Sequence, residues 1–155
     1  MVHTAPGFVA GPGDELTMRT LPVFFDVLAL LLSAGVTTVA EAAFQDQVWR
    51  PRLQPLLGLA QLRIVHCTVD ADVAFRRALR RAQDNPRRAH ADPALEYLES
   101  PQAEAEYRLR HQAFQPISLD APSLEVDTTD GCRPGLDQIV AFVNRPARAL
   151  PQRGT

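Results

Sequence analysis

The apolar and polar positions of the chain divide it into alternating helical and extended segments. Between Asp14 and Ser33 apolar residues are dense and several recur at helical spacing, which predicts a helix. Asp14 is a suitable N-cap, Gly35 is a natural stop, and Pro22 is expected to kink this helix or to split it in two. Residues 1–13, which contain three glycines and two prolines, predict a loop before it.

Three short apolar runs predict β-strands. Val36–Ala43 begins with β-branched residues, Leu62–Val69 is the clearest run, and Ser123–Thr128 follows later in the chain. Helical spacing is found in the segments between and after them: Gln45–Leu57 in part, Ala71–Gln83, Pro93–His111 and Leu136–Asn144. This alternation predicts an α/β fold with a parallel sheet that helices cover on both faces.

The length of 155 residues predicts a single domain with a real hydrophobic core. We expect residues 14–145 to form this domain, after the loop of residues 1–13, and residues 146–155 to be a flexible tail. The last helix is amphipathic, and its apolar residues on one face are Leu136, Ile139, Val140 and Val143.

Charge and composition exclude several classes of protein. The net charge of −2 argues against a strongly basic nucleic-acid binder. Asp26 and Glu41 interrupt the apolar stretch Leu21–Phe44, so no membrane span is predicted. The first residues lack the pattern of a signal peptide, and we expect a cytoplasmic protein. All sixteen basic residues are arginine, so a mechanism that requires a lysine cannot run on this chain alone.

A carboxylate inside the first predicted strand raises the question of its purpose. Burying a carboxylate is costly unless it is paired, hydrogen-bonded or bound to a cation. Glu41 lies near the end of this strand, Asp70 follows the second strand, and Asp127 ends the third. Ligands of parallel α/β sheets bind beyond the carboxyl ends of the strands, so these acids lie where a site is expected.

Arginines gather in the helix after the second strand and in the loop that follows. They are Arg76, Arg77, Arg80, Arg81, Arg87 and Arg88. Arginines three and four residues apart share a helix face, and their guanidinium groups suit phosphate or carboxylate ligands. The alternative is a solvated face that pairs with the acidic residues of the next helix, Glu96, Glu99, Glu104 and Glu106.

The spacing of the other reactive residues does not indicate further chemistry. His66, His90 and His111 match no zinc pattern, and we expect His66 to be a core residue. Cys67 is expected to be a small buried hydrophobe, and its distance from Cys132 does not indicate a redox pair. The serines lack a G-x-S-x-G context, and the opening GFVAGPG neither follows a strand nor precedes a lysine, as a phosphate-binding loop would.

Three stretches of the chain resemble the later part of small P-loop kinases. They are VTTVAEAAF, RIVHCTVDADVAFRRALRRAQDNPRRAHAD and LEVDTTDGCRPGLDQIVAFV. The resemblance, over residues 14–145, is to the AAA-type ATP-binding proteins related to zeta toxins, chloramphenicol phosphotransferase and small-molecule kinases. It implies part of a three-layer α/β/α P-loop NTPase fold and the ATP-dependent phosphorylation of a small molecule, with ATP and Mg²⁺ as cofactors.

The resemblance also implies roles for individual residues. Glu41 matches an acidic residue near the magnesium ion and the substrate, and Cys67 and Asp70 match a Cys-x-x-Asp-like turn. The lid arginines that grip the nucleotide phosphates are matched by Arg77, Arg80, Arg81, Arg87 and Arg88. The turn near the adenine is matched by Asp127, Thr128 and the residues up to Pro134.

The most specific motif of the family has no counterpart in this sequence. The family's first strand and its phosphate loop, which carries the lysine, precede the region that matches, so the resemblance implies a chain truncated at its N-terminus. Phosphoryl transfer depends on those groups, and arginines alone are expected to bind a nucleotide weakly. The family's sheet order places the missing strand between Val36–Ala43 and Leu62–Val69. Three outcomes follow: these two strands pair directly, another chain supplies the missing strand, or the chain is unstable alone.

Three functional hypotheses follow from these patterns. The first is a truncated P-loop kinase-like domain in which Glu41 assists magnesium or orients the substrate hydroxyl. The second is a non-catalytic module, monomer or homodimer, that binds a nucleotide or a protein partner, or else a gene remnant. The third is another kind of α/β enzyme that uses Glu41 and His66, which no motif supports. The first two hypotheses differ in one requirement: a kinase needs the lysine of a phosphate loop, and a binding module does not.

Overall fold

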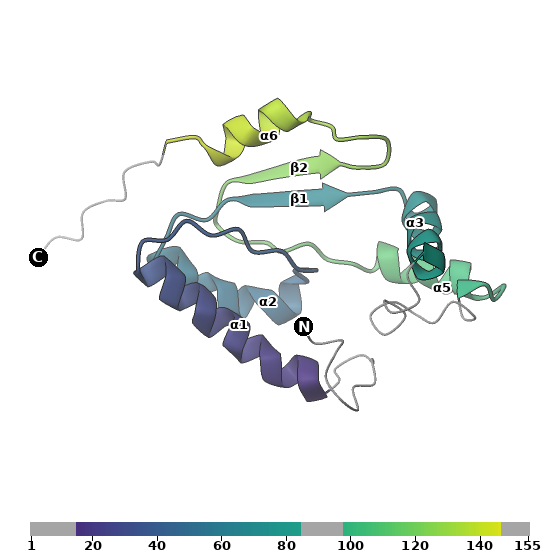
Figure 1. Ribbon diagram of the computed structural model, residues 1–155, viewed down its shortest axis with the longest axis horizontal. Helices are drawn as coiled ribbons and strands as arrows, with labels where there is room; N and C mark the ends of the chain where they lie inside the picture. The colour runs from purple at the N-terminus through teal and green to yellow at the C-terminus, as the bar shows by residue number, and fades with distance from the viewer. Residues whose placement is uncertain (1–14, 85–97, 147–155) are drawn as a thin grey trace, which may run out of the picture.

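A computed structural model of the chain describes residues 15–84 and 98–146 (Figure 1). Its elements in chain order are α1 (Glu15–Ser33), α2 (Asp46–Leu53), the 3-10 helix η2 (Gln54–Gly58), β1 (Ile64–Thr68), α3 (Ala71–Asp84), α5 (Ala103–Gln112), β2 (Ser123–Asp127) and α6 (Leu136–Val143). Every helix predicted from the sequence has a counterpart among these elements, and two of the three predicted strands form. Within the described ranges, no helix is both long and apolar enough to cross a bilayer.

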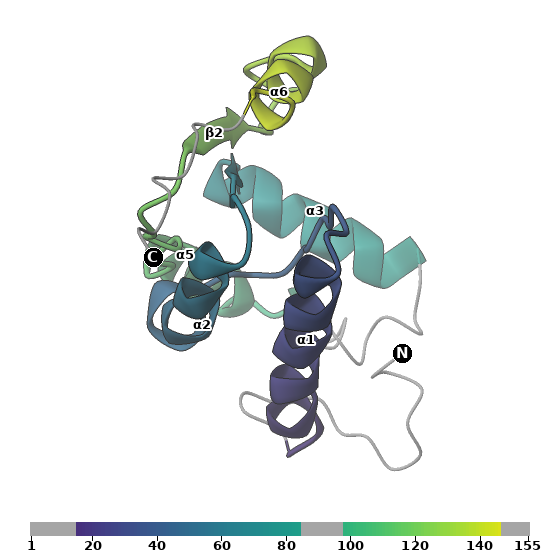
Figure 2. The same ribbon diagram turned by 90° about the vertical axis from the view of Figure 1, so that its left-hand side faces the viewer.

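The two strands form a parallel sheet. Its register pairs Ile64 with Ser123 at one end and Thr68 with Asp127 at the other. Both strands point toward α3 in Figure 1, and Figures 1 and 2 place α6 beyond β2 and both α1 and α2 on the side of β1. A parallel pair of strands with helices between them in sequence is the α/β arrangement that the alternating pattern predicts.

The first predicted strand does not form, so that prediction is wrong. Residues 36–43 have no strand pairing, and in Figure 1 they pass below β1. Val36 is 45% exposed and Val39 is 94% exposed. The apolar pattern reports the character of side chains, but a strand also needs a neighbour for its backbone groups, and the described residues place none beside this segment. Of the three outcomes stated for the missing strand, direct pairing of residues 36–43 with β1 is therefore not the one that the described residues show.

α1 is one helix, and Pro22 lies inside it without splitting it. The residues after Pro22 pack in a buried cluster with α2, and such packing outweighs local propensity. The predicted stop is confirmed, because Gly35 has a φ of +74°. Its N–H donates to the Leu32 carbonyl, and the N–H of Val36 donates to the Leu31 carbonyl. This pair of bonds is a Schellman motif, which needs a glycine at the left-handed position.

The buried side chains form two separate clusters. The first joins α1 to α2 and η2, and its buried members are Phe25, Leu28, Leu53 and Leu56. The second joins α3 to α5 and to Leu98, which lies between them in the chain, and its buried members are Phe75, Ala82, Leu98 and Ala103. Of the strand residues only Val126 is buried, and no polar side chain is buried in the described part of the chain. Neither cluster therefore covers the sheet completely.

The apolar face of α6 is largely exposed. Leu136, Val140 and Val143 are 70%, 45% and 42% exposed, and Phe142 is the buried residue of the helix. Phe142 lines a hollow together with Pro122, which directly precedes β2. The helix therefore turns its largest apolar side chain toward the residues that precede the two strands and leaves Leu136, Val140 and Val143 partly in solvent.

Candidate functional site

Hydrogen bonds join the carboxyl ends of the two strands to the loops that follow them. The hydroxyl and the N–H of Thr128 both donate to the Thr68 carbonyl, each at 2.8 Å. The N–H of Asp70 donates to the Thr129 hydroxyl oxygen at 2.9 Å. These bonds fix the loop after β2 against the start of α3, at the edge of the sheet where the sequence predicts a site.

Asp70 is the N-cap of α3. Its Oδ1 atom accepts hydrogen bonds from the N–H groups of Asp72 at 3.0 Å and Val73 at 3.1 Å. These are two of the N–H groups that a helix cannot satisfy by itself, so the side chain stabilises the start of the helix. The Cys-x-x-Asp-like turn suggested by the resemblance thus ends in a capping residue.

Asp127 organises the turn after β2. Its Oδ1 atom accepts the N–H of Thr129 at 2.8 Å, and its backbone exchanges two hydrogen bonds with Arg133, at 2.8 and 2.9 Å. The backbone and side-chain hydrogen bonds from Thr129, and then the charge of Arg133, lower the pKa of Asp127 below its ordinary value. Thr128 and the half-buried Pro134, which follows a cis peptide bond, belong to the same turn. The predicted adenine-side residues are therefore brought together.

Arg77 holds α3 to this turn. One nitrogen of its guanidinium group donates to the carbonyl of Thr128 at 2.7 Å and to that of Thr129 at 3.1 Å. Both acceptors are backbone oxygens of the loop between β2 and α6. Arg77 thus has a structural task, whichever ligand the neighbouring arginines bind.

The other arginines of α3 lie toward solvent. Arg80 is 3.9 Å from Asp84, and both side chains are largely exposed, while Arg81 is exposed as well. The buried face of α3 is made of small and aromatic residues, so its arginines occupy the opposite face. The remaining two predicted lid residues, Arg87 and Arg88, lie outside the described residues.

Glu104 of α5 pairs with an arginine of its own helix. Arg108 donates to Glu104 at 2.7 Å, and its other contact is Asp72 of α3, also at 2.7 Å. All three side chains are about half exposed. The α3–α5 contact therefore includes an ion-pair network. Its arginine lies on α5, whereas the alternative stated above paired the arginines of α3 with the acidic residues of the next helix.

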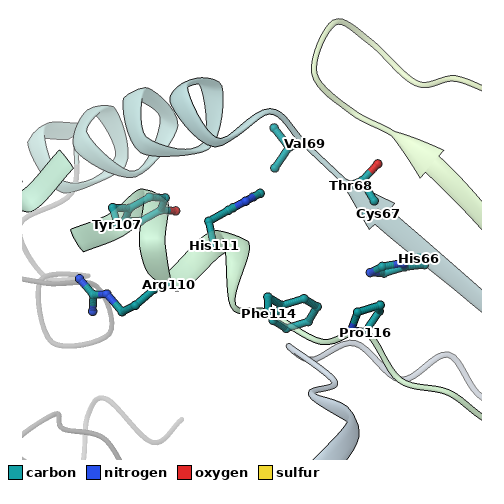
Figure 3. Close-up of a pocket in the computed structure, with 9 residues that line it drawn as sticks. All are labelled: His66, Cys67, Thr68, Val69, Tyr107, Arg110, His111, Phe114 and Pro116. Carbon is teal, nitrogen blue, oxygen red and sulfur yellow. The ribbon is translucent and has the colours of Figure 1, made fainter. Parts of the chain in front are cut away.

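A pocket opens beside the carboxyl half of β1 (Figure 3). Its volume is about 420 Å³. The residues that line it come from β1, α5 and the segment after α5: His66, Cys67, Thr68, Val69, Tyr107, Arg110, His111, Phe114 and Pro116. This lining is mostly apolar and aromatic and contains no carboxylate. The size and the lining are typical of a site for a small organic ligand, and the charge favours a neutral or anionic one.

Two predictions about β1 are wrong for the same reason. His66 is half-buried and stacks on Phe114, with ring centroids 6.4 Å apart and planes 25° from parallel, so it is a pocket wall and not a core residue. Cys67 is exposed and not buried. Both residues are open to solvent because, in the described part of the chain, the sheet ends at β1.

The α5 side of the pocket was not anticipated, because that segment has the composition of a solvated helix. Figure 3 shows the His111 ring extending from α5 toward Val69 at the end of β1. Tyr107 and His111 are one helical turn apart, and Phe114 follows three residues later. This i, i+4, i+7 spacing of ring side chains was the signal that could have revealed a partly buried face.

Glu41 is exposed on residues 36–43 and does not line the pocket. Because this segment is not a strand, Glu41 does not lie at a strand end, and the cost of burying its carboxylate does not arise. Within residues 15–84 and 98–146, no group of three or more histidine, cysteine, aspartate or glutamate side chains is arranged to hold a metal ion.

A solved structure shares this fold. The chain resembles the crystal structure of a "putative kinase" from Chloroflexus aurantiacus J-10-fl, with a TM-score of 0.69 and 23% sequence identity. The match covers 86% of this chain and 70% of that chain. No protein-family model matches the sequence, and no curated protein matches it. The similarity therefore establishes a common α/β fold.

Proposed function

We propose that the chain is part of a kinase-like phosphotransferase that transfers a phosphoryl group from ATP to a small molecule. The observation that carries this proposal is the fold shared with a protein named as a kinase, over 86% of the chain. The resemblance of three sequence stretches to P-loop kinases of the zeta-toxin and chloramphenicol-phosphotransferase type suggests the same class of reaction.

In this proposal the pocket beside β1 receives the reacting groups. Phosphoryl transfer is catalysed mainly by positioning and by neutralising charge on the phosphates. Arg110 supplies positive charge in the pocket lining, which has no carboxylate that would repel a phosphate, and Arg80 and Arg81 supply more on the exposed face of α3. The turn of Asp127 and Thr128, with Pro134, is proposed to lie beside the adenine.

Mg²⁺ would accompany the phosphates of ATP. This ion is usually held by phosphate oxygens, water and one or two carboxylates, and a ready-made cluster of acidic residues is not required. Glu41 is the carboxylate proposed for this contact, by the family resemblance. Its exposed side chain is free to move toward a bound nucleotide without the loss of a buried contact.

The proposal requires a phosphate-binding loop with a lysine, and these 155 residues contain none. We propose that another segment of polypeptide supplies it. The described residues would then contribute the lid arginines of α3, the pocket and the adenine-side turn.

The test begins with the protein as the cell makes it. A C-terminal affinity tag on the chromosomal gene isolates whatever polypeptide carries this chain, and its ATP consumption is measured with mixtures of small-molecule acceptors. ATP binding is measured in parallel by calorimetry at low salt, for the wild type and for the double variant Arg80→Gln/Arg81→Gln. We expect binding that weakens by about tenfold in the double variant. A protein that neither binds nor consumes ATP would refute the proposal.

A nucleotide-binding module without turnover is the second candidate. The observation that favours it is the absence of lysine from the sequence. It predicts ATP binding that is sensitive to the same double variant, with no ATP consumption in any acceptor mixture.

A further inference from the structure

One wall of the pocket has no secondary structure of its own. Phe114 and Pro116 form this wall beside His66 (Figure 3), and they belong to the segment between α5 and β2, residues 113–122. The ring of Phe114 stacks on His66 with ring centroids 6.4 Å apart. A loop keeps a precise position only through its contacts to other elements, so the anchors of this segment decide the shape of the pocket.

One residue of α2 holds this wall by two hydrogen bonds. The N–H of Asp46 donates to the Gln115 carbonyl at 3.1 Å, and the Asp46 Oδ1 atom accepts the N–H of Ser118 at 2.8 Å. Pro116 lies between the two bonded residues, and Phe114 directly precedes the first of them. Both pocket residues are therefore fixed from α2.

The surroundings of Asp46 suit a carboxylate that works inside the structure. Its side chain is only 16% exposed, and one of its oxygens is 3.4 Å from Nε of Arg50 on the same helix. A carboxylate so far from water needs a hydrogen-bond donor and a positive charge, and Ser118 and Arg50 supply them. An antiparallel bridge between Gln45 and Pro116 adds to the same contact. The carboxylate thus connects two stretches of chain that are 72 residues apart.

The pocket lies where the two buried clusters approach each other. Tyr107, on one wall, packs on Phe75 in the α3–α5 cluster, with ring centroids 5.5 Å apart. Ile117 and Leu119, which follow the other wall, pack against the cluster of α1 and α2. Asp46 therefore attaches one wall to the first cluster, while the opposite wall belongs to the second.

We infer that Asp46 is a positioning residue of the pocket: it sets the distance of Phe114 and Pro116 from β1 and thereby the width of the pocket. Asp46 does not line the pocket and acts through the backbone of residues 115–118. Its effect on catalysis rests on the proposed function, whereas its effect on the position of Phe114 does not. The task needs a hydrogen-bond acceptor, so asparagine is expected to replace the aspartate and alanine is not.

The position of Phe114 is measured by NMR from its ring-current effect on the ring protons of His66, at one pH and without nucleotide. Phe114→Leu gives the full size of this effect. We expect Asp46→Ala to remove at least about half of it, because the wall loses one of its two hydrogen bonds to α2. Asp46→Asn is expected to retain nearly all of it.

Arg50→Met is the matched control. It removes the ion pair of Asp46 but leaves both hydrogen bonds to the wall, so the His66 resonances should stay unchanged. If Asp46→Ala does not fold, Asp46→Glu takes its place, because it keeps the charge and shifts the acceptor atom by one methylene group. That variant is also expected to move the His66 resonances toward those of Phe114→Leu.

ATP consumption by the polypeptide isolated with the C-terminal tag is the second measurement. We expect Asp46→Ala to lower kcat by at least about tenfold, because a small misplacement of a pocket wall misaligns the reacting groups. Asp46→Asn should restore most of this activity. A wild type that consumes no ATP would refute the proposed function, and the NMR result would still decide whether Asp46 positions the wall.

Two results would overturn the inference. The first is an Asp46→Ala protein whose His66 resonances equal those of the wild type, which would show that Asp46 does not hold the wall. The second is an equal displacement in Asp46→Asn and Asp46→Ala, which would show that the hydrogen bond to Ser118 is not the cause. A displaced wall with an unchanged kcat would overturn the catalytic part of the inference.

Discussion

Replacement of single arginines on α3 separates a structural role from a ligand-binding one. Arg77 makes two hydrogen bonds to the carbonyls of Thr128 and Thr129, at 2.7 and 3.1 Å. A hydrogen bond to a charged group contributes about 1.5–3 kcal/mol when shielded, and much less at an exposed position. Arg77 is exposed, so Arg77→Met is expected to lower the free energy of unfolding by about 1–2 kcal/mol. Arg81→Met removes no hydrogen bond within the described chain and is expected to change it by less than about 0.5 kcal/mol.

The assay combines urea unfolding, followed by circular dichroism, with calorimetric titration of ATP at low salt. A loss of 1–2 kcal/mol corresponds to a fall of about 3–8 °C in the melting temperature for a chain of this size. Arg81→Met is expected to weaken ATP binding severalfold without changing stability, and Arg77→Met to do the opposite. Equal stability of the two variants would refute the structural reading of Arg77. Loss of ATP binding in a fully stable Arg77→Met protein would place this residue with the phosphate-binding arginines.

Three further predictions concern other parts of the chain. Glu41→Gln is expected to reduce the turnover of the assembled kinase by at least about tenfold without lowering its melting temperature, because the side chain is exposed; an unchanged kcat would exclude Glu41 from the mechanism. Because folding lowers the pKa of Asp127, its ionised carboxylate stabilises the folded chain fully at pH values above the ordinary pKa of aspartate, about 4. This stabilisation is lost as the pH falls from there through the lowered pKa. Thr129→Val keeps the backbone hydrogen bond and removes only the contribution of the hydroxyl, so it should raise this pKa part of the way toward its ordinary value in an NMR titration; an unchanged pKa would contradict the contribution assigned to the hydroxyl. Leu98→Ala should lower the free energy of unfolding measured by circular dichroism by about 3 kcal/mol, because it leaves a cavity in the α3–α5 cluster. The unfolding midpoint measured by the fluorescence of Trp49, which packs in the α1–α2 cluster, should stay nearly unchanged. Equal shifts of both signals would show that the two clusters unfold together.

Features that depend on neighbours in sequence could be predicted. The left-handed stop at Gly35 was predicted from local hydrogen-bonding rules and is present. The predicted N-cap Asp14 lies outside the described residues, and the N-cap at Asp70 was not predicted although it follows from the same kind of rule. The two strands that form were also recognised from their short apolar, β-branched runs. In each case the information lies within a few residues of the feature itself.

Features that depend on distant segments could not be predicted. The pocket joins His66 of β1 to Tyr107 and His111 of α5, about forty residues apart in the chain, and the local pattern of apolar and polar residues does not show that these elements lie side by side. Arg77 is a similar case, because its residue type suits a phosphate and a backbone carbonyl equally well. Only the position of the loop after β2 distinguishes the two roles.

The segment Val36–Ala43 shows how a correct pattern can lead to a wrong element. Its apolar side chains are those of a buried strand, yet Val39 is 94% exposed and no described strand pairs with it. Burying one valine side chain contributes about 1.5–3 kcal/mol, but an extended segment gains this only if its backbone groups are paired at the same time. A strand paired with this segment would meet both conditions at once. The sequence pattern and the structure then agree: the residues are suited to a strand, and the described chain lacks the neighbour that would make them one.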